Sequence, residues 1–257
     1  MNLHCGHSEL AQLETKLRKL FVRAFATYNL LSDDDHVLVG LSGGKDSLFL
    51  LDMLARQMRI DHPHFMVEAL HVRMENISYF TSPSYLERFC SERGIPLHIR
   101  TTRFDTADTA HQSSRDVRRQ KSPCFLCSWN RRKQMFNMAQ KLGCNKIALG
   151  HHQDDIINTA LMNLIFQGRF GTMPALLKMK KMPLSIIRPL CMIEERDIQR
   201  FAELSGYEKQ TKLCPYERIS HRTDIRQLYD LAENLNPDVR HSIWNALNTA
   251  GKMVEDY

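Results

Sequence analysis

The chain has 257 residues, of which 43% are hydrophobic, and it carries a formal net charge of +6 at pH 7. This length and apolar content give no sign of disorder and predict a globular protein with one large core, or with a core and a small appendage. No apolar run reaches the roughly 18 residues of a membrane-spanning helix, and residues 1–10 lack the basic start and apolar middle of a signal peptide. We therefore expect a cytoplasmic protein that does not bind a membrane.

Helical and strand patterns alternate along most of the chain. Residues 9–28 carry apolar side chains at spacings of three and four, which predicts an amphipathic helix on the outside of the core. Five short apolar runs predict strands, and these cover 37–41, 67–72, 97–101, 146–149 and 186–190. Helical patterns cover 47–58, 83–93, 129–142, 154–165 and 194–204. The tail from about Arg222 predicts two more helices, the second with Asn236 as its cap and Pro237 at its first position.

The order of these elements predicts an α/β fold built on a doubly wound, five-stranded parallel sheet. The apolar runs are continuous rather than alternating, which indicates strands that helices bury on both faces. We expect an N-terminal helical segment over 1–35, an α/β domain over 36–215 and a C-terminal helical extension over 216–257.

This topology also predicts where a ligand binds. In doubly wound sheets, ligands lie beyond the carboxyl ends of the strands, near the point where the strand order reverses. The turns after Leu41, Val72, Thr101 and Leu149 should therefore share one crevice.

The first of these turns joins the strand predicted over 37–41 to the next helix. Its residues are Ser42, Gly43, Gly44, Lys45, Asp46 and Ser47. Backbone N–H groups of a glycine-rich turn and a helix N-terminus bind phosphate oxygens, and the hydroxyls and the lysine add donors and charge. An aspartate beside phosphates suits Mg²⁺ binding. The turn is not a Walker A loop, because Gly40 and Gly44 enclose three residues rather than four and an aspartate follows the lysine.

The sequence Ser-Gly-Gly-Lys-Asp-Ser resembles the signature of the PP-loop ATP pyrophosphatases. The resemblance implies a sheet of the adenine nucleotide alpha hydrolase type. It also implies an enzyme that cleaves ATP between the α and β phosphates, with Mg²⁺, and adenylates a substrate oxygen. It implies ATP-binding roles for residues 42–47 and catalytic roles for Lys45 and Asp46. This motif alone leaves the acceptor substrate open.

A second polar turn, GHHQDD over residues 150–155, follows the strand predicted over 146–149 and opens a helix. Acidic residues favour a first helical turn whatever their function, because they interact with the helix dipole. Their predicted closeness to the phosphates also suits Mg²⁺ or adenylate handling by Asp154 or Asp155, and we take Asp154 as the catalytic candidate. We expect Val72, Gly150 and His151 to contact the nucleotide.

Basic residues gather in two regions, which favours a polyanionic partner, with a solvated basic face as the alternative. The first region contains Arg115, Arg118, Arg119, Lys121, Arg131, Arg132 and Lys133. The second contains Lys178, Lys180 and Lys181. Arg169, in a glycine-rich segment, is a further candidate for contact with ATP or with that partner.

Three of the seven cysteines form a candidate metal site. Cys124 and Cys127 precede the helix predicted over 129–142, where the helix dipole and nearby arginines stabilise thiolates. Cys214 follows the last predicted core helix, and a parallel sheet can bring that segment back to the crevice. Three thiolates suit an iron–sulfur cluster with one iron left without a protein ligand, or zinc with a fourth ligand such as histidine. We expect no role for the other cysteines, which are Cys5, Cys90, Cys144 and Cys191.

Four ordered motifs over roughly residues 10–250 resemble the tRNA 2-thiocytidine synthetase family. They are the SGGKDS turn, Pro-Cys-x-x-Cys with a following Arg-Arg pair, the GHHxDD turn and a late single cysteine. The resemblance implies a [4Fe–4S] cluster held by Cys124, Cys127 and Cys214 in a PP-loop domain over 36–215. It also implies redox-neutral replacement of a cytidine oxygen by sulfur in the tRNA anticodon loop. A cysteine desulfurase or sulfide would donate the sulfur, and the family precedent is a homodimer.

Other functions fit parts of the sequence. After Cys214 the chain reads Pro-Tyr-Glu over residues 215–217 rather than the Gly-Ser-Gln type of continuation, which leaves the modified base and its position open. A PP-loop enzyme that amidates its acceptor or ligates lysine to it would have no use for three convergent cysteines. A nucleotide-binding protein with a structural zinc site would bind zinc and release no pyrophosphate.

Overall fold

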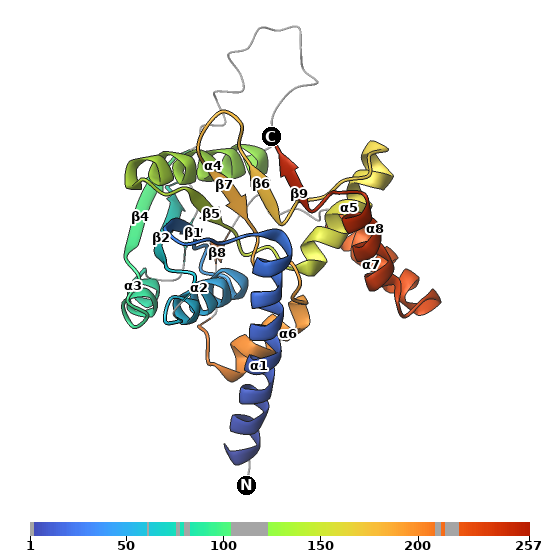
Figure 1. The fold of residues 1–257 in the computed structure, drawn as a ribbon, viewed down its shortest axis with the longest axis horizontal. Helices are drawn as coiled ribbons and strands as arrows, with labels where there is room; N and C mark the ends of the chain where they lie inside the picture. The colour runs from blue at the N-terminus through green and yellow to red at the C-terminus, as the bar shows by residue number, and fades with distance from the viewer. Residues whose placement is uncertain are drawn as a thin grey trace, which may run out of the picture.

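The computed structural model describes residues 3–60, 62–75, 78–79, 83–103, 123–208, 212–213 and 221–257. The strands are β1 (Asp35–Gly40), β2 (Phe65–Met74), β3 (Ser78–Tyr79), β4 (Leu97–Thr102), β5 (Lys146–Ala148), β6 (Leu176–Lys178), β7 (Ser185–Ile187), β8 (Lys212–Leu213) and β9 (Val254–Asp256). The helices are α1 (Leu3–Tyr28), α2 (Lys45–Gln57), α3 (Ser84–Ser91), α4 (Pro123–Leu142), α5 (Gln153–Gln167), α6 (Glu195–Leu204), α7 (His221–Leu235) and α8 (Val239–Thr249). Figure 1 shows their arrangement around one central sheet.

The central sheet runs in the order β4-β2-β1-β5-β7-β6-β9. The first five of these strands are parallel to one another, which confirms the predicted doubly wound α/β fold. The sheet is wider than the five strands we predicted, because β6 pairs antiparallel with β7 and β9 pairs parallel with β6. Both additional strands have three residues, which is too short for a periodic pattern to indicate them.

The strand order locates the switch point of the sheet. From β1 the chain moves outward through β2 to β4, and then returns to the other side of β1 as β5. The crevice between the carboxyl ends of β1 and β5 is therefore the place where this topology binds ligands. The turn over residues 42–47 follows β1, and the turn over residues 150–152 follows β5.

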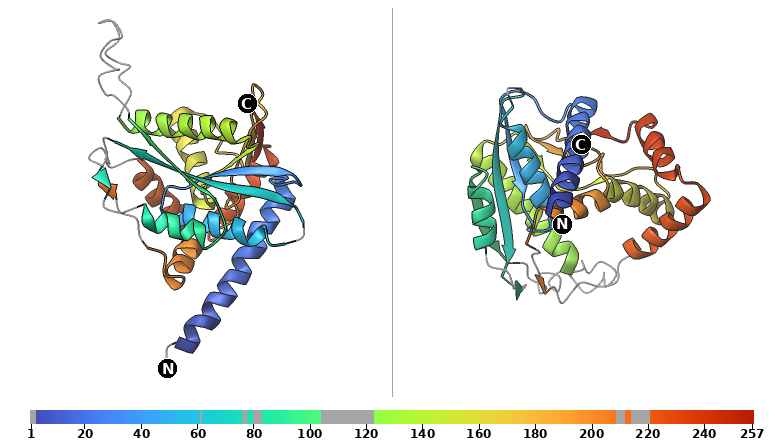
Figure 2. Two further views of the ribbon diagram at one scale, coloured as in Figure 1. Left: turned by 90° about the vertical axis from the view of Figure 1, so that its left-hand side faces the viewer. Right: turned by 90° about the horizontal axis from the view of Figure 1, so that it is seen from below.

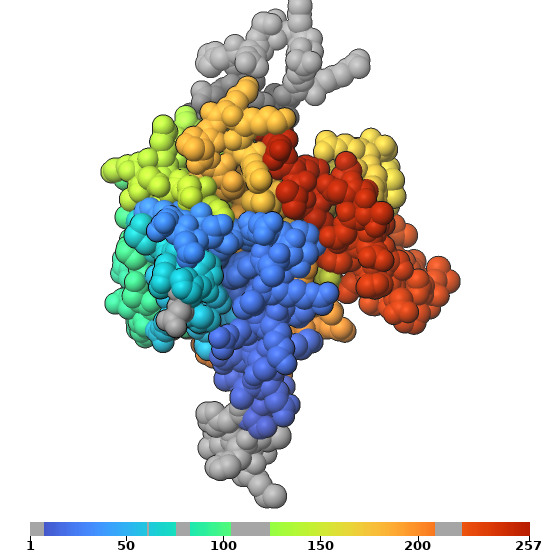
Figure 3. Space-filling model, viewed as in Figure 1, coloured from blue at the N-terminus to red at the C-terminus, as the bar shows by residue number. Residues whose placement is uncertain are grey.

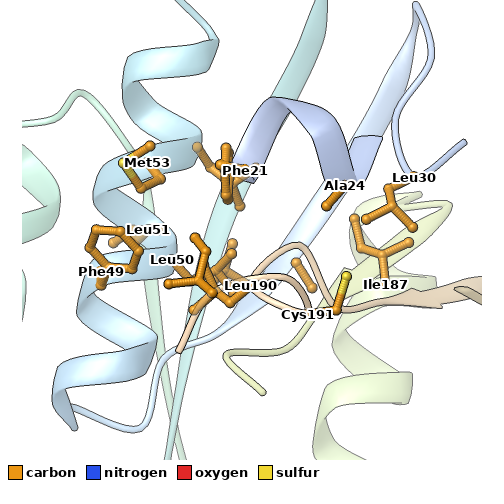
Figure 4. Close-up of a cluster of buried hydrophobic side chains, with 14 of the residues drawn as sticks. Phe21, Ala24, Leu30, Phe49, Leu50, Leu51, Met53, Ile187, Leu190 and Cys191 are labelled. Atoms are coloured by element: carbon orange, nitrogen blue, oxygen red, sulfur yellow. The ribbon is translucent and has the colours of Figure 1, made fainter. Parts of the chain in front are cut away.

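Helices bury both faces of the sheet, as the continuous apolar strands predicted. On one face, Leu38 of β1 packs in a cluster with Leu70 and Ile147 and with Met138 of α4. On the other face, the neighbouring strand residue Val37 belongs to a larger cluster with α1, α2, α3 and α6. Figure 2 shows α4 on its own side of the sheet, and Figure 4 shows part of the larger cluster, in which α1, α2 and the segment after β7 meet.

The starts of α4 and α8 differ from the predictions, whereas that of α7 agrees with its prediction. Helix α4 begins at Pro123 rather than near residue 129, so Cys124 and Cys127 lie inside the helix. Helix α8 begins at Val239, because the Asn236 side chain accepts a hydrogen bond from the Asp238 N–H (3.0 Å) and so closes a turn that precedes the helix. Helix α7 begins at His221, close to its predicted start.

Cys90, Cys144 and Cys191 are buried, as predicted, and Cys5 has no described side chain. Burial raises the pKa of Cys90 to about 11 and the pKa of Cys191 to about 12, which keeps both thiols protonated. In the part of the chain that the structure describes, no helix has both the length and the apolar character needed to cross a bilayer.

Candidate functional site

The turn over residues 42–47, which we call the nucleotide turn, is closed by its own side chains. The Ser47 hydroxyl donates to the Gly44 carbonyl (2.9 Å) and accepts from the Ser42 N–H (3.2 Å). Gly43 has a φ of +85°, a left-handed conformation that favours glycine. Helix α2 begins at Lys45, so the N–H groups of its first turn have no partner within the helix. The positive end of the helix dipole therefore lies at this turn, as an anion site requires.

Gly150 brings the second turn against the first. A Cβ atom at Gly150 would lie 3.1 Å from the Asp46 carbonyl and from the Ser47 nitrogen, both backbone atoms. This contact is tighter than ordinary packing, so a larger residue would force the two turns a few tenths of an ångström apart. The structure therefore confirms that the turns after β1 and β5 share one crevice.

Lys45 and Asp46 lie in this crevice with an acidic residue that the sequence did not identify. The Lys45 ammonium is 2.9 Å from the Glu195 carboxylate and 3.2 Å from Asp46 Oδ1. Burial lowers the pKa of Lys45, but the Glu195 and Asp46 carboxylates more than reverse this, so its pKa is raised. The ammonium is therefore charged at neutral pH and available for phosphate.

Asp46 offers an oxygen for a cation. Its Oδ1 is buried and has no hydrogen-bond donor among the described residues, although it lies in an ion pair with Lys45. A carboxylate oxygen of this kind suits a hard cation such as Mg²⁺. The donor chemistry of the turn therefore fits magnesium.

Asp154 lies in a charge network that joins several helices. Its Oδ2 accepts the Glu195 N–H (2.7 Å), and its Oδ1 accepts a hydrogen bond from Arg240 of α8 (2.8 Å). Burial raises the pKa of Asp154, but the contacts with His152, Arg240 and the Glu195 N–H hold the pKa well below its usual value. Both oxygens have protein donors, and the predicted role of Asp154 in Mg²⁺ or adenylate handling stays a prediction.

The Glu195 side chain extends this charge network to the nucleotide turn. Its second oxygen accepts a hydrogen bond from Arg226 of α7 (2.6 Å), while its first contacts Lys45. A cavity of about 380 Å³ adjoins the network, with Asp154, Glu195 and Tyr229 in its lining. The network thus connects the nucleotide turn to both C-terminal helices, a link that patterns in the sequence could not indicate.

Asp155 has the helix-capping role that its position alone predicts. It accepts a hydrogen bond from the His152 N–H (3.2 Å) at the start of α5. The His152 ring is buried between Asp154 (3.5 Å) and Asp155 (3.4 Å). Burial lowers the pKa of His152, and these carboxylates together with Asp46 outweigh it, so the pKa is raised.

His151 faces a buried arginine. Arg188, which directly follows β7, places its Nε 3.2 Å from His151 Nδ1. Because a guanidinium only donates hydrogen bonds, Nδ1 accepts and the ring proton of neutral His151 lies on Nε2. Burial and the nearby Arg132 lower the pKa of Arg188 to about 10, so the guanidinium remains charged at neutral pH. Arg188 is a second site residue that the sequence analysis missed.

A third missed residue, His71 of β2, supports the end of β1. Its Nδ1 is 2.8 Å from the Leu41 carbonyl, and burial lowers the pKa of His71 and keeps the ring neutral. Val72 follows it inside β2, where its side chain is buried in the cluster beneath α4. The strand continues to Met74, so the turn after β2 begins two residues later than predicted.

Two of the three candidate metal ligands lie in the first turns of α4. Cys124 is exposed, and Cys127 is partly buried against the cluster that contains Val72 and Met74 of β2. Neither is in a disulfide. Thiolate ligands on this helix start suit a soft metal centre or an iron–sulfur cluster.

Cys214 lies outside the described residues. The preceding residue, Leu213 of β8, pairs with Ser78 of β3, just beyond the carboxyl end of β2. The chain therefore returns to the carboxyl edge of the sheet immediately before Cys214. Over the described ranges, no three His, Cys, Asp or Glu side chains come close enough to bind a metal, and the proposed trio stays a prediction.

The predicted basic regions separate in the structure. Arg131, Arg132 and Lys133 lie on α4, whereas residues 115–121 lie outside the described residues. Lys178, Lys180 and Lys181 lie in the β6–β7 hairpin, whose tip precedes β7 and is therefore at the amino edge of the parallel strands, opposite the crevice. Arg169 follows the far end of α5, about 20 Å along the helix from the crevice at 1.5 Å per residue.

Comparisons with known proteins agree with this architecture. The PP-loop domain family matches residues 10–227. The tRNA-cytidine(32) 2-sulfurtransferase of Bordetella avium is 33% identical over 239 residues, which is 92% of this chain and 73% of the relative. That of Pseudomonas putida is 32% identical over 249 residues, which is 95% of this chain and 88% of the relative.

A solved structure shares the fold. The U34-tRNA thiolase of Methanococcus maripaludis with its [4Fe–4S] cluster superposes with a TM-score of 0.69 over 93% of this chain and 78% of that chain. The two sequences are 24% identical. At this identity the likeness shows a common fold and no more.

Proposed function

This chain belongs to the PP-loop family and, within it, to the family of the tRNA-cytidine(32) 2-sulfurtransferases, and we propose that it thiolates a tRNA cytidine with ATP. The observation that carries the proposal is the convergence at one edge of the sheet. The nucleotide turn, the Gly150 turn and the strand that ends at Leu213 all lie at the carboxyl ends of the parallel strands, and Cys127 packs beside the end of β2.

Residues of the nucleotide turn would bind ATP. The N–H groups at the start of α2 bind phosphate oxygens, and Lys45 moves its ammonium from Glu195 to the phosphates. Asp46 Oδ1 would hold Mg²⁺, which would supply positive charge beside the phosphates. The Lys45 ammonium stabilises the negative charge that develops on the leaving pyrophosphate, which is the main catalytic effect available to such a site.

Cys124, Cys127 and Cys214 would hold a [4Fe–4S] cluster, which when bound supplies the sulfur nucleophile. The base oxygen attacks the α-phosphorus of ATP, and the P–O bond to pyrophosphate breaks. Sulfur then replaces the adenylated oxygen, which leaves with AMP, so the exchange is redox-neutral. The His151 Nε2–H is a donor at this edge of the sheet, suited to a base or phosphate oxygen.

The remaining parts of the proposal concern partners and domains. The substrate is a nucleotide in the tRNA anticodon loop, since an unpaired base leaves its stack at low cost. Free sulfide, or a cysteine desulfurase together with a thiol that reduces its persulfide to sulfide, donates the sulfur, and the enzyme works as a homodimer in the cytoplasm. The catalytic domain spans 36–215, with an N-terminal helical segment over 1–35 and a C-terminal extension over 216–257 that contains α7 and α8 and returns to the sheet as β9.

Mass spectrometry of tRNA nucleosides tests the function directly. Cells that lack the gene should lose a thiolated cytidine, and the wild-type gene should restore it whereas Cys124→Ala should not. Undiminished product with Cys124→Ala would favour a PP-loop enzyme with another acceptor, such as an amidating or lysine-ligating enzyme. Zinc rather than iron after anaerobic purification, with no pyrophosphate release on addition of tRNA, would favour a nucleotide-binding protein with a structural zinc site.

A further inference from the structure

Helix α4 exposes two aromatic side chains beside the cysteine pair. Phe125 and Trp129 have exposed fractions of 50% and 51%. They are four residues apart, so they lie on the same side of the helix. The opposite side packs on the sheet through Cys127 and Met138. Large aromatic side chains on the outer face of a covering helix often mark an interaction surface.

The same face of α4 is cationic. The Lys133 ammonium lies 5.3 Å from the centre of the Trp129 ring, and Arg132 is exposed beside it. The sequence of α4 contains three arginines or lysines in a row over residues 131–133 and neither Asp nor Glu. Several cations without a carboxylate on a helix that also exposes aromatic rings form a surface suited to binding a polyanion.

These features begin in the same turn of the helix as the proposed cluster ligands. At 1.5 Å per residue, the Trp129 Cα is about 3 Å along the axis from Cys127 and about 7.5 Å from Cys124. Figure 3 shows α4 at the molecular surface. Around the helix axis, at 100° per residue, Trp129 lies about 200° from Cys127 and about 140° from Cys124, so the aromatic residues and the cysteines lie on different sides of the same helix end.

We propose that Phe125, Trp129, Arg132 and Lys133, which we call the α4 face, bind the single-stranded part of the RNA substrate. An unpaired base stacks on the Trp129 ring, and Arg132 and Lys133 bind the adjoining phosphates. This inference rests on the proposed tRNA thiolation. Single-stranded nucleic acid presents flat bases and negatively charged phosphates in alternation. Its bases stack on aromatic side chains, and its phosphates bind in basic grooves.

Other exposed apolar surfaces of the described residues have a different composition. Leu164, Ile165 and Phe166 on α5 and Leu228, Leu231 and Leu235 on α7 are mostly aliphatic. The exposed large apolar residues of α4 are both aromatic. Stacking requires the flat face of a ring, so the α4 face suits nucleobases better than these aliphatic surfaces do.

The first experiment measures the affinity of the full-length protein for a tRNA anticodon stem-loop. Trp129→Ala should weaken binding about 5- to 150-fold, the range for loss of one stacked base, whereas Trp129→Phe should retain most of the affinity. Lys133→Ala should lower the slope of log affinity against log salt by about 1. Phe166→Ala, which removes a similarly exposed aromatic ring (53%) from α5, should leave the affinity unchanged.

The second experiment uses tryptophan fluorescence. The chain has two tryptophans, so in a Trp244→Phe variant Trp129 is the single reporter. Stem-loop RNA should quench its emission, and a fully paired duplex of the same length should not. Equal quenching by both RNAs, or no quenching by either at concentrations that saturate binding, would overturn the stacking proposal.

The outcomes also separate this inference from the proposed function. A wild-type protein that neither binds the stem-loop nor restores thiolated cytidine would refute the proposed function, and the α4 face with it. A wild-type protein that does both, with unchanged RNA affinity in Trp129→Ala, would refute only the α4 face. If Trp129→Ala kept its RNA affinity but lost thiolation, the α4 face would instead be a binding surface for a protein that delivers sulfur.

Discussion

Two neighbouring parts of the candidate site are held together in different ways. In the nucleotide turn, the hydrogen bonds of Ser42, Gly44 and Ser47 join residues two to five positions apart. In the charge network, the contacts of Glu195 with Lys45 and of Arg240 with Asp154 span 150 and 86 positions. The turn can therefore form from its own sequence, whereas the network forms only when distant elements pack. Changes in the turn should impair chemistry more than stability, and changes in the network should do the reverse.

The largest effect is expected for Lys45→Ala in the nucleotide turn. Loss of a cation that faces the developing charge of pyrophosphate should slow pyrophosphate release by roughly 10²- to 10³-fold. The melting temperature should change little, because the side chain is partly exposed and its removal also relieves the burial of a charge. Lys141→Ala, an exposed lysine at the end of α4, serves as the control. A wild-type rate for Lys45→Ala would contradict the assignment of this turn to ATP.

Gly150→Ala tests the contact between the two turns. The added methyl group would meet backbone atoms of Asp46 and Ser47 at 3.1 Å, so we expect a loss of about 1–3 kcal/mol in the free energy of unfolding and weaker ATP binding. Denaturant unfolding and an ATP titration measure the two effects. At Gly171 a Cβ would meet only the flexible Arg169 side chain, at 3.4 Å or more, and Gly171→Ala should be nearly neutral. Equal effects of both variants would contradict the close approach.

Asp154→Asn tests the charge network. It leaves Arg240 without its anionic partner and should lower the free energy of unfolding by about 1–2 kcal/mol at pH 7. Because folding lowers the pKa of Asp154, the carboxylate stabilises the fold above its unfolded pKa of about 4, and this contribution is lost as the pH falls through the folded pKa.

The free energy of unfolding of wild type and of Asp154→Asn, measured across a range of pH, tests this prediction. The difference between wild type and Asp154→Asn should be constant near neutral pH and shrink on acidification. Asp155→Asn, one residue away, weakens the cap on the His152 N–H and the contact with the His152 ring but leaves the Arg240 ion pair intact, so it should cost less. A difference that grows on acidification would show that the Asp154 carboxylate does not stabilise the fold.

The smallest effect is expected for Glu195→Gln. The substitution keeps the shape of the side chain and removes the charge that holds Lys45, so phosphates should compete for Lys45 more easily. ATP affinity should rise about two- to fivefold, equivalent to a partly exposed ion pair of about 0.5–1 kcal/mol. Isothermal titration with ATP measures the change, and weaker ATP binding would indicate that Glu195 helps to bind the nucleotide instead.

Features that depend on residues close together in the chain could be predicted from the sequence, whereas features that depend on contacts between distant residues could not. The five parallel strands and the phosphate-binding character of residues 42–47 depend on apolar runs and local turn chemistry, and both were predicted. Strand β9 depends on an edge that β6 creates, and α4 begins earlier than its apolar pattern indicates. Glu195 was unpredictable because its partners Lys45 and Arg226 lie on other elements. A single histidine in an apolar strand, such as His71, likewise gives no local signal of the carbonyl it contacts.

By itself, the sequence determined the α/β class, the order of the parallel strands along the chain, and a glycine-rich turn suited to phosphate. These properties depend on side-chain periodicity and on backbone conformations that neighbouring residues impose. Only the tertiary structure decided that Glu195 holds Lys45, that Arg188 sets the tautomer of His151, and that Trp129 is exposed on α4. Those relations are distances between residues remote in the chain, and they exist only after the helices have packed on the two faces of the sheet.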